Sequence, residues 1–141
     1  MGSAVIDNGW TLDVSANAYQ VVLQYSEHAD DYGFTYDLGV EQARDLAWNL
    51  RRAAANARDG LYVDRRVDRR QPAPFAEFGS TPLPNGWSLD VFATTEREVV
   101  LRCDWHHNGY RYSYHMNGVQ GHNLGWFLGE AADAVSSLRQ S

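Results

Sequence analysis

The stretch Asn8-Gly9-Trp10-Thr11-Leu12-Asp13-Val14 returns 77 residues later as Asn85-Gly86-Trp87-Ser88-Leu89-Asp90-Val91. After one inserted residue, further matches follow at an offset of 78. They pair Val21, Leu23, Tyr36, Leu38, Leu46, Trp48 and Leu50 with Val99, Leu101, Tyr114, Met116, Leu124, Trp126 and Leu128. Agreement across a whole unit is the mark of an internal repeat. The sequence therefore predicts a tandem duplication.

Each copy alternates apolar and polar residues in three segments and then changes to a helical spacing. In the first copy the alternation covers residues 10–14, 19–25 and 34–38, as half-buried strands do. The apolar stripes at helical spacing are Ala43, Leu46, Ala47, Leu50, Ala54 and Ala57, then Gly121, Leu124, Gly125, Leu128, Ala132 and Val135. The two glycines of the second stripe predict close approach of that helix to its sheet. The opposite faces of the sheets carry short polar residues and predict a solvated surface.

The predicted fold class is α+β, a tandem duplication of a β-β-β-α unit with antiparallel sheets, each packed by one helix. The first unit covers residues 1–58 and the second covers 85–141, and together they form one pseudo-symmetric domain. A connector rich in arginine and proline joins them at 59–84. Because a connector of this length without structure is unusual, we expect a short strand at 61–63. We also expect Phe75 and Phe78 to hold the rest against the body.

Both helices have the same start signal. Gly39 and Asn117 stand at the N-cap positions, and Gln42 and Gln120 follow three residues later. A glutamine at that position can reach back to the backbone amide of the cap residue and close a capping box. The predicted helices therefore begin directly after Gly39 and Asn117.

The charge is unevenly distributed along the chain. The net charge is −6, yet residues 44–70 hold eight of the twelve arginines and four of the eighteen acids. An acidic chain repels nucleic acid non-specifically, whereas a local basic patch can bind an anion or an acidic partner. The alternative is that these arginines pair with the acidic part of the chain itself.

Two tryptophans stand out because they lie off the apolar stripes. Trp48 and Trp126 hold the same place in their helices, about 100–150° from the stripe at roughly 100° per residue. Each either packs on the other unit of the chain or forms a dimer or partner surface, where tryptophan is a common anchor. The candidate binding arginines beside them are Arg44, Arg51 and Arg52 on the first helix, and Arg65, Arg66, Arg69 and Arg70 in the connector.

The second unit gathers potential metal ligands without an accepted spacing. The loop that begins Trp105-His106-His107 is a candidate contact loop, with a plain turn as the alternative reading. Its histidines and Cys103 match no zinc pattern, and Cys103 falls on the inward side of its strand. We expect no metal and no cofactor. Since no phosphate loop, nucleophile elbow or histidine–carboxylate motif is present in the sequence, we expect no catalytic activity.

The unit resembles a known family. The pattern Leu12-Asp13-Val14, a second strand, and then Phe34-Thr35-Tyr36-Asp37-Leu38 leading into a helix looks like a PUR repeat. That family uses tandem Whirly-like units of four strands and a helix, which bind single-stranded nucleic acid, and the resemblance covers most of both units. The helix Gly39-Val40-Glu41-Gln42-Ala43-Arg44-Asp45-Leu46-Ala47 is similar to the C-terminal helix of small uncharacterised actinobacterial proteins. The absence of lysine also fits a high-GC actinobacterial or phage genome.

Two functions follow from these observations. The first is a small non-catalytic binding or regulatory protein that acts through a protein partner or through self-association. The alternative, implied by the resemblance, is a single-stranded nucleic-acid-binding protein. No apolar run approaches the roughly 18 residues of a membrane helix. The lone cysteine suits a reducing environment, and we expect a cytoplasmic location.

Overall fold

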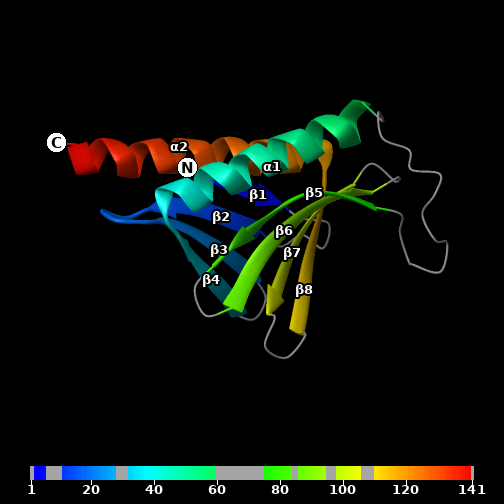
Figure 1. Cartoon of the computed structure of the whole chain (residues 1–141), viewed down its shortest axis with the longest axis horizontal. Helices are drawn as coiled ribbons and strands as arrows, with labels where there is room; N and C mark the ends of the chain where they lie inside the picture. The colour runs from blue at the N-terminus through cyan, green and yellow to red at the C-terminus, as the bar shows by residue number, and fades with distance from the viewer. Residues whose placement is uncertain are drawn as a thin grey trace.

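The computed structural model describes residues 2–5, 11–27, 32–59, 75–83, 86–94, 98–105 and 110–140. They form two antiparallel four-stranded sheets, each in sequential strand order and each followed by a helix (Figure 1). The elements are β1 (Gly2–Val5), β2 (Thr11–Ala16), β3 (Val21–Glu27), β4 (Tyr32–Leu38), α1 (Val40–Asp59), β5 (Phe75–Pro82), β6 (Trp87–Thr94), β7 (Glu98–Trp105), β8 (Tyr110–Asn117) and α2 (Gly118–Gln140). The predicted α+β class and the duplicated unit are confirmed.

The prediction of three strands per unit is wrong, because each unit has a fourth strand in front of them. In the first unit this strand is β1, and in the second it is β5, which lies inside the stretch assigned to the connector. Both escaped detection for physical reasons. The short β1 holds only small residues and one valine, and β5 contains a bulge between Glu77 and Gly79 that interrupts its alternation. Phe78 packs against the core as expected, while 61–63 and the side chain of Phe75 lie outside the described residues.

The extra strands belong to the duplication. Ser3 in β1 and Ser80 in β5 are 77 residues apart, the offset found for the first predicted strands. Each serine hydroxyl donates a hydrogen bond to the carboxylate of the neighbouring strand, from Ser3 to Asp13 and from Ser80 to Asp90, at 2.5 Å in both cases. The same side-chain contact at the same repeat position shows that β1 and β5 are equivalent.

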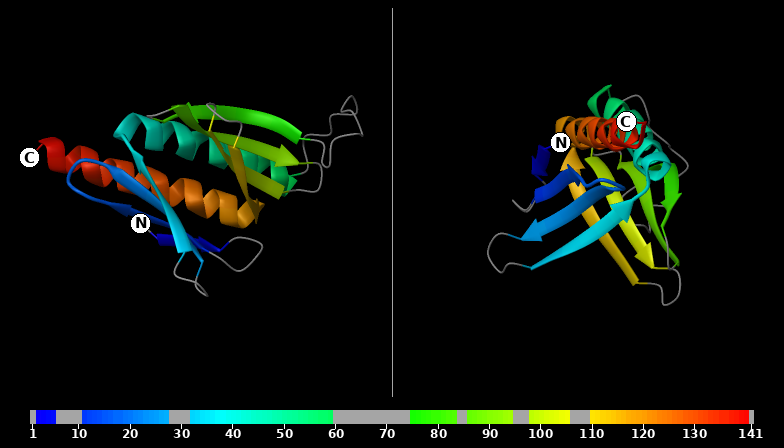
Figure 2. Two further views of the ribbon diagram at one scale, coloured as in Figure 1. Left: turned by 90° about the horizontal axis from the view of Figure 1, so that it is seen from below. Right: turned by 90° about the vertical axis from the view of Figure 1, so that its left-hand side faces the viewer.

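Each helix packs chiefly on the sheet of the other unit. Helix α1 lies against β5 and β6, and α2 lies against β1 and β2. Equivalent glycines make both contacts close, since a Cβ on Gly79 would fall 2.3 Å from Nδ2 of Asn49 in α1. A Cβ on Gly2 would fall 2.8 Å from the Phe127 ring in α2. The two helices therefore form one layer side by side, with the two sheets diverging beneath it (Figure 2).

The core confirms the predicted helix phases and caps. All members of both stripes are buried, together with the inward residues of the strands such as Leu12 and Leu101. Gln42 Oε1 accepts a hydrogen bond from the Gly39 amide at 2.8 Å, and Gln120 Oε1 accepts one from the Asn117 amide at 2.9 Å. Both helices thus begin with the expected reach-back of a glutamine side chain.

Equivalent residues of the two units meet at the centre of the molecule. Ala47 of α1 and Gly125 of α2 hold equivalent positions in the repeat, and a Cβ on Gly125 would lie 3.0 Å from the carbonyl oxygen of Ala47. The two helices therefore cross at a point where both have small side chains. Gly125 therefore faces the other helix, while Gly121 approaches the sheet at Val99, as predicted. Between the sheets, the hydroxyls of Tyr36 and Tyr114 are 2.7 Å apart. These two pairs mark the pseudo-two-fold axis of the duplication.

Candidate functional site

The two off-stripe tryptophans lie on the outer surface of the helix layer. Trp48 is 60% exposed and Trp126 is 53% exposed, although tryptophan is usually well buried. The reading that they pack between the units is therefore wrong, because that space is filled by the small residues of the two stripes. The outward stripes of α1 and α2 form a surface that we call the helix face, defined by residues 41, 44, 48, 51 and 52 with 119, 122, 126, 130 and 133.

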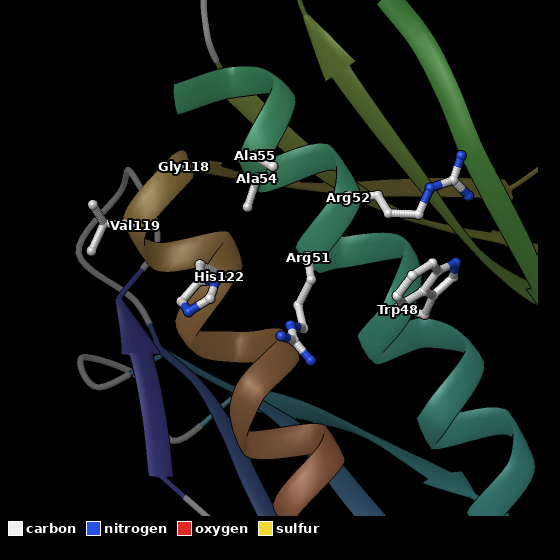
Figure 3. Close-up of a pocket in the computed structure, with 8 residues that line it drawn as sticks. All are labelled: Trp48, Arg51, Arg52, Ala54, Ala55, Gly118, Val119 and His122. Carbon is white, nitrogen blue, oxygen red and sulfur yellow. The ribbon is translucent and has the colours of Figure 1, made fainter. Parts of the chain in front are cut away.

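A pocket of about 350 Å³ opens on the helix face beside Trp48 (Figure 3). Its lining comes from the middle and the C-terminal half of α1 and from the first turns of α2. The lining residues are Trp48, Arg51, Arg52, Ala54, Ala55, Gly118, Val119 and His122. Arg51 extends into the space between the helices, with His122 on one side and Trp48 on the other (Figure 3). The lining is mostly apolar and carries two guanidinium groups, so it suits a hydrophobic group that bears a negative charge.

Packing against other elements positions both pocket arginines. The Arg52 guanidinium lies over the ring of Phe78 in β5, 5.5 Å from its centroid, which is a cation–π distance. Arg51 runs along the bare backbone of Gly125, because a Cβ there would be 2.8 Å from its Cγ. The first contact depends on the packing of α1 on the sheet of the second unit, and the second contact depends on the packing of α1 against α2.

The surroundings of Trp126 have the opposite charge. Arg44 forms an ion pair with Asp133 at 3.1 Å and a longer one with Glu41 at 3.9 Å. Glu130 is exposed one turn beyond Trp126. Arg44 shares the helix face with Arg51 and Arg52, but it lies one turn to the other side of Trp48, where it pairs with Asp133 of α2.

The helix face thus has two chemically distinct ends. The basic end consists of Trp48, Arg51, Arg52 and His122, and none of the described residues that line its pocket is acidic. The acidic end consists of Trp126, Glu41, Arg44, Glu130 and Asp133, which carry three negative charges and one positive charge. Glu41 and Asp133 keep 93% and 76% of their side chains exposed, so their charge is presented to solvent. Sequence reasoning missed His122 and Val119, whose place in the pocket depends on how α2 packs on α1.

Several predicted binding residues lie outside the described residues. They are Arg65, Arg66, Arg69 and Arg70 of the connector, and His106 and His107 of the contact loop. Trp105 ends β7 and pairs through its backbone with Trp87 and Tyr110, while its side chain is not described.

The outer face of the second sheet is less solvated than predicted. Ser88, Asp90 and Val100 are buried there, whereas Asp13 in the first sheet is half-buried. Arg102 accounts for part of this difference, because its guanidinium lies 4.5 Å from the centroid of the Phe92 ring. The same group is 3.5 Å from the Asp90 carboxylate and 3.7 Å from that of Asp104. One guanidinium thus lies between two carboxylates of neighbouring strands, which is the arrangement of a structural ion-pair network.

Cys103 is buried in the core, as its inward strand position predicted. Burial raises the pKa of the Cys103 thiol to about 11, against a hydrogen bond from Tyr36 that lowers it. Burial and the neighbouring Tyr114 likewise raise the pKa of Tyr36. A thiol held protonated at neutral pH is a poor nucleophile, and here it is a packing group.

No protein-family model, curated protein or solved structure matches this chain. Within the described residues, histidine, cysteine and carboxylate side chains form no group of three that could hold a metal ion. Neither helix of the described part of the chain is long and apolar enough to cross a membrane.

Proposed function

We propose that this chain is a non-catalytic binding protein that engages a protein partner through its helix face. The observation that carries the proposal is the exposure of Trp48 and Trp126 at equivalent positions of the duplicated helices. Neither tryptophan is needed to fill the core, because the buried stripes of both helices already do so.

Burial of the two tryptophans would supply a substantial part of a binding free energy. An aromatic side chain buries roughly 150–250 Å² when fully covered, and more than half of each tryptophan surface is still available. At about 25 cal/mol per Å², covering the exposed part would contribute roughly 3 kcal/mol for each residue. Exposed charges around each ring would form the polar rim that surrounds such anchors in known interfaces.

The proposal is tested by capturing partners from cell extract on immobilised chain. Wild type is compared with Trp48→Ala and Trp126→Ala, and with Tyr19→Ala as the matched control. Tyr19 is 71% exposed but lies in the turn between β2 and β3, away from the helix face. We expect Tyr19→Ala to capture the same protein as wild type, and both tryptophan variants to lose at least about 90% of it. Equal capture by all four chains would refute the proposal.

The tryptophan variants should remain folded, so that lost binding can be interpreted. Because Trp48 is mostly exposed, its truncation should change the free energy of unfolding by no more than about 1 kcal/mol. Denaturant unfolding followed by circular dichroism measures this change. A loss of 3–5 kcal/mol, typical of a buried tryptophan, would assign Trp48 a structural role instead.

Single-stranded nucleic-acid binding is the second candidate. The fourth strand of each unit supports it, because tandem units of four strands and a helix are what the PUR resemblance implies. Against it, the exposed residues on the outer face of the first sheet, such as Gln24, Thr35 and Asp37, offer no ring for base stacking. Retardation of a labelled single-stranded oligonucleotide at low salt, reversed by added salt, would favour this function over the first.

We also propose that the chain works in a reducing cytoplasm. The support is its single cysteine, which is buried and unpaired.

A further inference from the structure

We propose that the helix face binds a second copy of this chain, with the two copies reversed end to end so that each basic end lies on the acidic end of the other. This inference rests on the proposed function, because it names the partner of the same surface. It is carried by the distribution of charge around two equivalent tryptophans.

The two ends are complementary in sign and nearly equal in magnitude. Arg51 and Arg52 give the basic end a charge of +2 with histidine neutral, and the four ionised groups of the acidic end sum to −2. Each end also carries one exposed tryptophan at the same repeat position. A surface that holds both members of a complementary pair is suited to an isologous dimer, in which one patch binds its own copy.

The charges also select the orientation of the dimer. If the copies stacked with like ends together, Arg51 and Arg52 would face their own counterparts, and the acidic side chains would do the same. Like charges placed opposite one another across an interface are strongly unfavourable. A two-fold axis perpendicular to the helices reverses one copy end to end, so neither the two basic ends nor the two acidic ends face each other. The pocket beside Trp48 of one copy then lies opposite the carboxylates around Trp126 of the other.

The helix face is large enough for such an interface. Helices of 20 and 23 residues are about 30 Å long and, lying side by side, about 20 Å wide, which gives roughly 600 Å² in projection. A typical stable interface covers about 800 Å² of accessible surface on each partner, and accessible area exceeds projected area when side chains protrude. The total accessible surface of the chain is 8196 Å², so this would be about a tenth of it.

Charge reversal in separate ends provides the test. Variant A carries Arg51→Glu and Arg52→Glu, so both of its ends are negative. Variant B carries Glu41→Arg and Glu130→Arg, so both of its ends are positive. Control C carries Asp37→Arg and Glu77→Arg, which change the net charge as much as variant B does, but at exposed positions on the strands. Sedimentation velocity at low salt measures the mass of each chain, and circular dichroism verifies its fold.

We expect wild type and control C to dimerise, while A alone and B alone dimerise at least about tenfold more weakly. An equimolar mixture of A and B should recover a dimer of one chain of each kind, because every contact between them again joins opposite charges. Monomeric A and B that fail to form this mixed dimer would overturn the reversed orientation. Dimers of A and of B as strong as those of wild type would overturn the use of the helix face.

A failure of this inference is distinguishable from a failure of the proposed function. Wild type that stays monomeric at millimolar concentration refutes the dimer. If the chain nevertheless captures another protein in a manner sensitive to Trp48→Ala, the helix face keeps its proposed binding role. Capture that is insensitive to that substitution refutes the proposed function itself.

Discussion

Replacement of Gly125 by alanine probes the contact that holds the two units in one layer. A Cβ at this position would lie 2.8 Å from Arg51 Cγ, 3.0 Å from the carbonyl oxygen of Ala47 and 3.4 Å from Leu50 Cβ. The arginine side chain can move aside, but the carbonyl oxygen belongs to the backbone of α1. The added methyl group therefore requires the helices to separate by a few tenths of an ångström.

Two opposing effects determine the magnitude for Gly125→Ala. Overpacking at a tight contact costs about 1–3 kcal/mol. Alanine inside a helix is favoured over glycine by about 1 kcal/mol. The free energy of unfolding should therefore fall by about 0–2 kcal/mol, depending on how far the helices can yield.

Gly129 supplies a matched control in the same helix. A Cβ there would meet nothing within 4 Å, so Gly129→Ala keeps the gain in helix propensity and meets no steric cost. It should raise the free energy of unfolding by about 1 kcal/mol. The difference between the two variants, about 1–3 kcal/mol, then isolates the cost of the helix crossing.

Urea unfolding of the two variants and wild type measures these changes. The urea midpoint of Gly125→Ala should decrease and that of Gly129→Ala should increase, while the slope of the unfolding free energy against urea concentration stays constant. If Gly125→Ala is stabilised as much as Gly129→Ala, the helices do not approach closely at this position and the account of the pseudo-two-fold axis is refuted.

Three further predictions concern the core and the absence of metal. Leu46→Ala and Leu124→Ala should each lower the free energy of unfolding by about 2–5 kcal/mol, because both side chains are fully buried; unchanged denaturant midpoints in both would show that the helix phases are wrong. The unfolded chain releases its thiol proton above about pH 8.5, whereas Cys103 in the folded chain keeps it to about pH 11. Stability should therefore decrease as pH rises through this window, and less steeply in Cys103→Ala; equal slopes in urea unfolding would exclude a contribution of the thiol. Elemental analysis should find no stoichiometric zinc, and zinc that is lost on His106→Ala would contradict this.

Much of the local structure of this protein was determined by its sequence. The repeat offsets identified equivalent positions, alternation located three of the four strands in each unit, and the glutamines at positions 42 and 120 marked both helix starts. These features depend on residues near one another in the chain, so a periodic pattern is enough to predict them. The fourth strands lacked that pattern, because β1 has almost no large apolar residues and β5 is interrupted by a bulge.

The tertiary structure alone decided what each apolar face packs against. In a duplicated chain the inward faces of the two sheets are nearly equivalent, so the stripe of α1 fits either sheet and the sequence cannot choose. The close contact of Gly79 in β5 with Asn49 in α1 shows that α1 packs on the sheet of the second unit. The candidate site follows from it: the helix pairing brings His122 beside Arg51 and pairs Arg44 with Asp133. Periodicity placed Trp48 off the stripe, but only the close approach of two small-residue helices left no space for it inside and kept it on the surface.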